Sequence, residues 1–345
     1  MERAISIGIV GLGRLGKRHA ENLAKRVRGV ELVAAASPLA EERAWAEESL
    51  EVPAYADLGS LLAHPGLDAA WLVTPTSLHA EQAIEVLEAG KHLFCEKPLS
   101  LDVAPCDRVI EVARGRPGQV ATIGFMRRFD PAYAEVKRAV AAGELGRVFR
   151  VHAESHDPAD PDAFFVKFAP TSGGIFLDCC IHDIDLVRWI LEGARPRRVT
   201  ARGTRVMYPG LGSCGDVDTA AATVEFELPG GSASQAALAT FHVSRTSHRG
   251  YEATMSVTGT EGALSCGRGI PELPVLRERS GGSFAAGQAD FFSRFGPAFL
   301  LEAQAFAQAI RSGRAGTRSL EDAREATRLA VAMRESLERG STVEL

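Results

Sequence analysis

Two ionisable side chains near the middle of the chain have the spacing of a proton-transfer site. Asp178 and His182 stand four residues apart and Asp185 extends the repeat, so a single helix would present all three on one face. A histidine titrates near neutral pH and can accept a hydroxyl proton while a carboxylate orients the same substrate. The alternative is structural, with the acids capping the helix and His182 buried and hydrogen-bonded in the core.

A metal site is a second functional possibility for this stretch, because Cys179 and Cys180 lie beside the histidine. Zinc needs about three or four convergent ligands. Adjacent residues of a helix point to different faces, so these two thiols do not converge. The sequence therefore predicts no metal ion.

Lys97 is the third candidate for chemistry. It follows the apolar run His92–Cys95, which we expect to be a buried strand, so the lysine stem would be packed and its amine delivered to a site. A partly desolvated lysine has a lowered pKa and can act in acid–base chemistry. The alternative is a surface lysine paired with Glu96.

The stretch that would bring a cofactor to these groups lies at the start of the chain. Ile5–Val10 is an apolar run rich in β-branched residues, as in a buried parallel strand, and a helical pattern through Ala24 follows it. Between them, Gly11 permits a tight turn, Gly13 lets the backbone approach a pyrophosphate, and Gly16 lets the helix pack closely on the strand. The free N–H groups of the helix N-terminus would hold the anion. This order predicts a dinucleotide-binding fold.

The second expected strand, Val30–Ala36, ends without the acid that usually binds the ribose 2′-hydroxyl. Ser37 stands at that position, and Arg43 lies within reach of a 2′-phosphate. A missing acid removes the repulsion that excludes NADP. Because Arg43 fits an exposed helix position equally well, the sequence leaves the choice between NAD and NADP open.

Strand and helix patterns alternate through the first third of the chain. The expected strands continue with Ala69–Val73, His92–Cys95 and Gln119–Gly124, and the expected helices are Leu78–Ala89 and Val103–Arg114. This alternation predicts a parallel sheet with right-handed crossovers, in which ligands bind at the carboxyl ends of the strands. The loops at 74–77, 96–98 and 125–128 should therefore face the cofactor.

The pattern changes after Gly124. Alternating runs at Val148–Ser155, Arg198–Val206, Ala220–Leu228, Ala233–Val243 and Glu252–Thr258 predict a mainly antiparallel sheet. We therefore expect an α/β Rossmann domain over residues 1–123 and an α+β domain with a large open-faced sheet over residues 124–345. Its amphipathic C-terminal helices, Leu300–Ile310 and Leu320–Leu337, should pack back on the core.

Composition excludes several classes of protein. The 345 residues carry a net charge of −5, which argues against a nucleic-acid-binding surface. No apolar run approaches the ~18 residues of a membrane span. Six scattered cysteines without CxxC spacing, and an N-terminal strand in place of a signal peptide, predict a cytoplasmic protein.

Four stretches together resemble the Gfo/Idh/MocA oxidoreductases. They are GIVGLGRLGKRHAENL at the N-terminus, FCEKPLS around Lys97, GFMRRFDPAY, and SGGIFLDCCIHDIDLVRW. Within that family the chain is similar to the inositol dehydrogenases, which act on myo- or scyllo-inositol. The resemblance covers nearly the whole chain, and it implies a homotetramer that buries the open sheet face and often a cis peptide before the proline of the EKP motif.

The resemblance also implies roles for individual residues. His182 would be the catalytic base, Asp178 would orient the substrate, and Lys97 would bind a substrate hydroxyl and join the proton relay. Arg127, Asp157 and Tyr251 would complete the substrate contacts. The residues expected to bind the cofactor are Gly11, Gly13, Arg14, Leu15, Gly16, Ser37, Arg43, Thr74, Pro75, Thr76, His79, Glu96, Lys97 and Arg127.

These observations lead to the hypothesis of an NAD(P)-dependent dehydrogenase that oxidises a ring secondary alcohol of a cyclitol to the ketone. One alternative is an NADP-linked reductase of sugars or keto-sugars from the same family, which Ser37 supports. Another is a non-catalytic regulator that binds NAD(P) and a partner. Retention of Lys97, Asp178 and His182 favours the enzyme.

Overall fold

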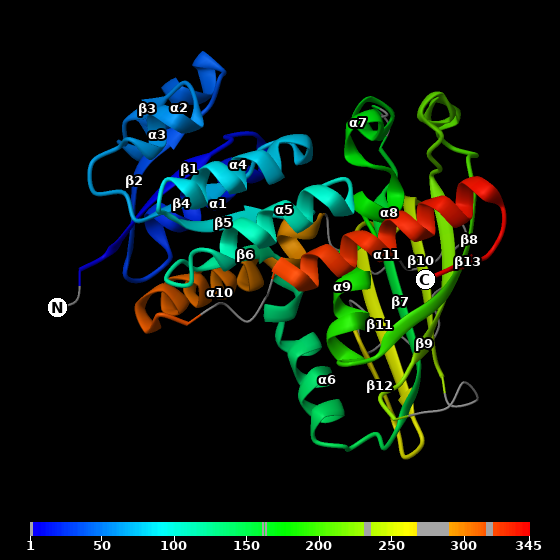
Figure 1. Cartoon of the computed structure of the whole chain (residues 1–345). Coiled ribbons are helices and arrows are strands. Elements are labelled where there is room, and N and C mark those ends of the chain that lie inside the picture. The colour runs from blue at the N-terminus through cyan, green and yellow to red at the C-terminus, as the bar shows by residue number, and fades with distance from the viewer. Residues whose placement is uncertain (1–2, 161, 163, 231–235, 268–289, 315–319) are drawn as a thin grey trace. The chain divides into compact units, whose positions relative to one another are not determined.

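The computed structural model describes residues 3–160, 162, 164–230, 236–267, 290–314 and 320–345 (Figure 1). The chain divides into two compact units. The first contains Met1–Met126 together with Pro297–Arg328, and the second contains Arg127–Gly296 together with Leu329–Leu345. The expected division at residues 123 and 124 assigned all of the C-terminal helices to the second domain, whereas part of them belongs to the first unit.

The first unit is built on a six-stranded parallel sheet in the order β3-β2-β1-β4-β5-β6. The strands are β1 (Ile5–Val10), β2 (Val30–Ala36), β3 (Ala54–Tyr55), β4 (Ala69–Leu72), β5 (His92–Glu96) and β6 (Ala121–Gly124). The strand order reverses between β1 and β4, which is the point where dinucleotides bind in sheets of this kind. The predicted parallel sheet is thus confirmed; five of its strands lie within two residues of the predicted ends, and the short β3 was not predicted.

Helices connect these strands, as the alternating pattern predicts. They are α1 (Arg14–Lys25), α2 (Ala40–Leu50), α3 (Leu58–Leu62), α4 (Thr76–Glu88) and α5 (Val103–Arg114). Two long helices, α10 (Phe291–Ser312) and α11 (Leu320–Arg339), follow near the C-terminus, and each contributes residues to both units. None of the helices among the described residues combines the length and apolarity that a membrane span requires.

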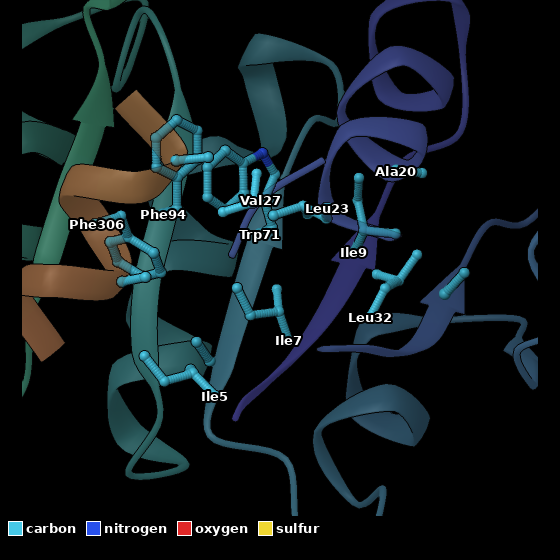
Figure 2. Close-up of a cluster of buried hydrophobic side chains, with 14 of the residues drawn as sticks. Ile5, Ile7, Ile9, Ala20, Leu23, Val27, Leu32, Trp71, Phe94 and Phe306 are labelled. Carbon is cyan, nitrogen blue, oxygen red and sulfur yellow. The ribbon is translucent and has the colours of Figure 1, made fainter. Parts of the chain in front are cut away.

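An aromatic group holds the middle of the first unit together (Figure 2). Trp71 of β4 and Phe94 of β5 stack with ring centroids 3.5 Å apart, and Phe306 of α10 meets both rings edge-on. All three side chains are almost completely buried. Since Trp71 and Phe94 stand close to the carboxyl ends of their strands, this packing fixes the loops in which the chemistry-bearing residues lie.

The second unit contains a seven-stranded sheet in the order β12-β11-β7-β10-β9-β8-β13. Its strands are β7 (Val148–Pro158), β8 (Arg195–Thr204), β9 (Thr219–Glu227), β10 (Ala237–Ser247), β11 (Glu252–Gly259), β12 (Ala263–Cys266) and β13 (Val343–Glu344). All neighbours pair antiparallel except β7 and β10, which are parallel. The mainly antiparallel sheet is confirmed; residues 233–235 of the expected strand Ala233–Val243 lie outside the described residues.

The two faces of this sheet differ in burial. Along β7, Val151, Ala153 and Ser155 are buried, whereas the residues that alternate with them are partly exposed. Helices α8 (Ile175–Asp178) and α9 (Ile181–Ile190) contact β10 and β7, respectively. The unit is completed by the short helix η1 (Met126–Phe129), by α6 (Pro131–Ala141) and α7 (Phe164–Ser172), and by η2 (Pro209–Cys214).

Candidate active site

Gly11 and Gly16 adopt the predicted turn and close packing after β1, and the contact of Gly13 with a pyrophosphate stays a prediction. Gly11 has a φ of +91°, and a Cβ there would lie 2.4 Å from the carbonyl oxygen of Val73. A Cβ on Gly16 would lie 1.9 Å from the carbonyl oxygen of Gly11, so only glycine lets α1 approach the strand this closely. A Cβ on Gly13 would meet no atom within 4 Å. The exposed Gly13 and Arg14 therefore leave the N-terminus of α1 open to an anion.

At the end of β2, Ser37 is hydrogen-bonded to an acid that lies five residues further along the chain. Ser37 is buried, and its hydroxyl donates to Oε2 of Glu42 at 2.5 Å. Arg43 donates from Nη1 to the carbonyl oxygens of Ser37 and Pro38 at 2.8 and 2.9 Å, so its guanidinium fastens this loop. Glu42 thus places a carboxylate beside Ser37 at the end of β2, the region where an acid commonly selects the ribose 2′-hydroxyl over a 2′-phosphate, and its contact with a ribose stays a prediction.

This arrangement predicts the effect of neutralising Glu42. A Glu42→Gln variant should lower the ratio of kcat/KM with NAD to kcat/KM with NADP about tenfold, because the charge that repels a 2′-phosphate is lost. Glu41→Gln is the matched control, since Glu41 is exposed on the same helix turn. An equal change in both variants would contradict the assignment.

His79 connects the loops that follow β4 and β5. The ring is buried, and its Nδ1 and Nε2 lie 2.7 and 2.8 Å from the carbonyl oxygens of Pro98 and Thr74. Desolvation lowers the pKa of His79, and the two carbonyl acceptors oppose this only in part. Next to it, Thr74 donates to Oε1 of Gln82 at 2.5 Å. His79 therefore holds the loop after β4 in place, while Pro75 and Thr76 lie at the exposed start of helix α4; their contacts with a cofactor stay predictions.

The EKP turn is anchored through its glutamate. Glu96 is buried, with Oε1 2.8 Å from Nε2 of His19, and its Oε2 accepts the backbone N–H of Lys97 at 3.1 Å. The Lys97–Pro98 peptide is cis, as the resemblance implies. Lys97 itself is partly buried, which departs from the alternative of a surface lysine. Its catalytic role stays a prediction.

The stretch around Asp178 and His182 is not one helix. Helix α8 ends at Asp178 and α9 begins at Ile181, because the N–H groups of Cys179 and Cys180 both donate to the carbonyl oxygen of Ile175. The expectation of a single helix was wrong here, although Leu177, Ile181 and Ile184, which repeat at the spacing of one helix face, are all buried. The break places Asp178 at the end of one helix and His182, which is 7% exposed, in the first turn of the next.

Asp185 was expected on the same helix face as Asp178 and His182, but its side chain is buried in an ion pair. It is buried and accepts two hydrogen bonds from the guanidinium of Arg128, at 2.8 Å from Nε and 2.5 Å from Nη2. A bidentate pair of this kind satisfies both groups in the core. The third member of the predicted repeat is therefore structural.

Arg245 contacts the predicted site residue Asp178, and no signal in the sequence indicates this contact. Its side chain is fully buried and donates to Oδ2 of Asp178 at 3.1 Å and to Oδ2 of Asp216 at 2.6 Å. The other oxygen of Asp216 accepts the N–H of Ile175 at the start of α8. Desolvation alone would lower the pKa of Arg245, but the acidic groups around it, including Asp178, raise it overall. A permanent cation thus orients the Asp178 carboxylate.

Asp157 lies beside Asp178. The thiol of Cys179 is 3.4 Å from Oδ2 of Asp157 and 3.6 Å from Oδ2 of Asp178. The structure therefore brings these two predicted substrate-contact residues together at the end of β7 and the end of α8. Two partly exposed carboxylates so close can accept hydrogen bonds from neighbouring hydroxyls of a polyol.

Arg127 and Tyr251 form a buried network. Arg127 donates to Oδ1 of Asp183 at 2.7 Å and to the hydroxyl of Tyr251 at 2.9 Å, and Ser155 donates to Oδ2 of Asp183 at 2.5 Å. Desolvation raises the pKa of Tyr251 to about 12, so it remains a neutral phenol. Since Arg127 is only 2% exposed, this geometry favours a positioning role, and its contact with cofactor or substrate stays a prediction.

Comparison with known families identifies the family to which this chain belongs. Residues 5–125 match the Gfo/Idh/MocA oxidoreductase family with an NAD-binding Rossmann fold, and residues 133–265 match the Gfo/Idh/MocA C-terminal domain. The chain belongs to the Gfo/Idh/MocA oxidoreductases. The predicted family, the fold class and the NAD cofactor are thereby confirmed.

Relatives within the Gfo/Idh/MocA family span the whole chain. A scyllo-inositol 2-dehydrogenase (NAD⁺) of Bacillus subtilis is 36% identical, with 100% of this chain and 97% of that protein covered. A myo-inositol 2-dehydrogenase of Thermotoga maritima is 34% identical, with 98% of both covered. The crystal structure of a scyllo-inositol dehydrogenase from Lactobacillus casei, with bound NAD(H) and scyllo-inositol, gives a TM-score of 0.90 at 35% identity and 99% coverage of both chains.

Proposed function

We propose that this oxidoreductase oxidises a ring secondary hydroxyl of scyllo- or myo-inositol to the ketone. The observation that carries the proposal is the similarity, over the full length, to dehydrogenases named for these two cyclitols. The paired carboxylates of Asp157 and Asp178 support it, because a cyclitol presents neighbouring hydroxyls to such a pair.

The residues of this chain would position the substrate and take up the proton of the reacting hydroxyl. His182 accepts the hydroxyl proton. Asp178, whose carboxylate is held by a hydrogen bond from Arg245, orients the substrate. Lys97 binds a substrate hydroxyl and joins the proton relay. The open N-terminus of α1 and the Glu42 carboxylate fit a bound NAD. NAD supplies the chemistry of hydride acceptance.

The reductase alternative is less well supported. It depended on Ser37 and Arg43 accepting a 2′-phosphate, whereas Arg43 binds carbonyl oxygens of its own loop and Ser37 is bonded to an acid. The regulator alternative has no specific observation in its favour. A homotetramer and a cytoplasmic location stay predictions based on the resemblance.

Initial rates with a substrate panel test the proposed function. NAD and NADP reduction would be measured with myo-inositol, scyllo-inositol, D-chiro-inositol and common aldoses, with EDTA in a parallel series. We expect NAD-dependent oxidation of at least one inositol, unaffected by EDTA, because hydride transfer here uses protein groups and the nicotinamide only. Activity restricted to NADP would support the reductase, and cofactor binding without turnover of any substrate would contradict the dehydrogenase.

A further inference from the structure

A cluster of imidazoles and carboxylates lies on the partly exposed face of the second unit's sheet. His152, Glu154 and His156 alternate along β7 on the face opposite the buried Val151, Ala153 and Ser155. The neighbouring strand β10 contributes His242, whose partner in the parallel register is Glu154. Neither the proposed mechanism nor the cofactor uses these side chains.

Three of these residues have the spacing of metal ligands. One donor atom each from Glu154, His156 and His242 lie within 4.8 Å of one another, a grouping that among the described residues occurs here alone. Nε2 of His156 is 3.0 Å from Nδ1 of His242, and Oε1 of Glu154 is 3.9 Å from the same Nδ1. In a tetrahedral zinc site with bonds of about 2.0–2.1 Å, ligand atoms stand about 3.3 Å apart. Two of the observed distances bracket this value, and the atoms of the third pair lie within 4.8 Å of each other.

We propose that Glu154, His156 and His242 bind a divalent zinc-class cation, with a fourth position left for water. Two imidazoles and a carboxylate are a ligand set that zinc accepts with an open position. The site would join β7 to β10, the one parallel pair of this sheet.

The groups behind the ligands support this assignment. Nδ1 of His156 faces Oε2 of Glu252 at 3.4 Å, and since a carboxylate only accepts, this contact directs the lone pair of His156 to Nε2, toward His242. Glu154 is held by Nε2 of His152 at 2.8 Å and by the hydroxyl of Thr254 at 3.3 Å. Metal-binding imidazoles and carboxylates characteristically have such supporting hydrogen bonds.

Charge and access also suit a cation. Glu154 and Glu252 place two carboxylates around the cluster, and a divalent ion would balance both charges, although Arg249 lies 3.6 Å from Glu252 and offsets part of one. In the single chain the side chains of Glu154, His156 and His242 are 32%, 16% and 39% exposed, so the ligand atoms are accessible to an ion before a second subunit covers this face.

Cobalt titration of the metal-stripped, tag-free full chain tests the proposal. We expect one equivalent of Co²⁺ per chain to produce the intense visible absorption of a tetrahedral site, and zinc to displace it. His156→Ala and His242→Ala should abolish the band, and Glu252→Gln should weaken cobalt affinity about tenfold or more. His248→Ala is the matched control, because His248 is exposed outside the cluster.

Circular dichroism and the Tm of each metal-free variant would confirm that the fold is kept. Absence of the band in the folded wild-type chain, or its full retention in both His156→Ala and His242→Ala, would overturn the proposal. Failure of dehydrogenase activity would leave this test unaffected, since its readout is metal binding alone.

Discussion

The His182→Ala variant is expected to lose at least ~100-fold in kcat for inositol oxidation while binding NAD with nearly unchanged affinity. The proton acceptor is removed, whereas the glycine loop and Glu42, which are expected to bind the cofactor, belong to the first unit. Stopped-flow or steady-state rates at saturating substrate give kcat, and calorimetric titration gives the Kd for NAD. Partial recovery of turnover with added imidazole would support proton acceptance by His182.

The matched control for this variant is His248→Ala, which removes an exposed imidazole from the same unit. It should retain normal kcat. Near-normal turnover of His182→Ala would rule out the base assignment, and loss of NAD binding together with activity would show that the substitution acts on the cofactor or the fold.

The Arg127→Met variant is expected to be strongly destabilising, because it leaves the buried carboxylate of Asp183 without its cation. Breaking a buried ion pair in this way costs about 3–5 kcal/mol of unfolding free energy. Desolvation alone would lower the pKa of Arg127, but Tyr251 and Asp183 raise it overall, so the arginine remains charged in the folded chain. Urea titration followed by circular dichroism measures the loss.

The double variant Arg127→Met/Asp183→Leu distinguishes the contribution of Arg127 to stability from its contact with a ligand. Removing both charges should restore much of the stability, since a buried pair can be replaced by apolar groups at little cost. If Arg127 also touches the cofactor or substrate, KM will stay raised in the stable double variant. Arg138→Met is the control, because its ion pairs with Glu135 and Glu144 are exposed and its loss should change stability little. A similar loss from Arg127→Met and Arg138→Met would contradict the burial argument.

The local sequence was sufficient to predict those elements whose structure depends on their own residues. The β-branched composition of Ile5–Val10 predicted the first strand. The backbone freedom of the three glycines after it predicted the turn into the first helix. Helix α5 was predicted with both ends correct, Val103–Arg114. These elements depend on periodicity and turn chemistry, which a single sequence carries.

Features that depend on distant partners could not be predicted in the same way. The break at Cys179–Cys180 interrupts a stretch whose apolar repeat fits one continuous helix, and the capture of Asp178 by Arg245 joins residues 67 positions apart. The Glu42 carboxylate lies five residues beyond Ser37, on the next helix, so a search at the usual position of the acid does not find it. A buried arginine requires acidic partners, but the sequence alone does not indicate which arginine is buried.

The return of α10 to the first unit has a consequence for how this protein is made. Trp71 and Phe94 leave the ribosome long before Phe306, the ring that packs against both. At about 5–20 residues per second, translation of the intervening segment lasts on the order of ten seconds or more. During that interval the nascent nucleotide-binding unit presents an uncovered aromatic surface, so it is a natural client for chaperones until synthesis is nearly finished.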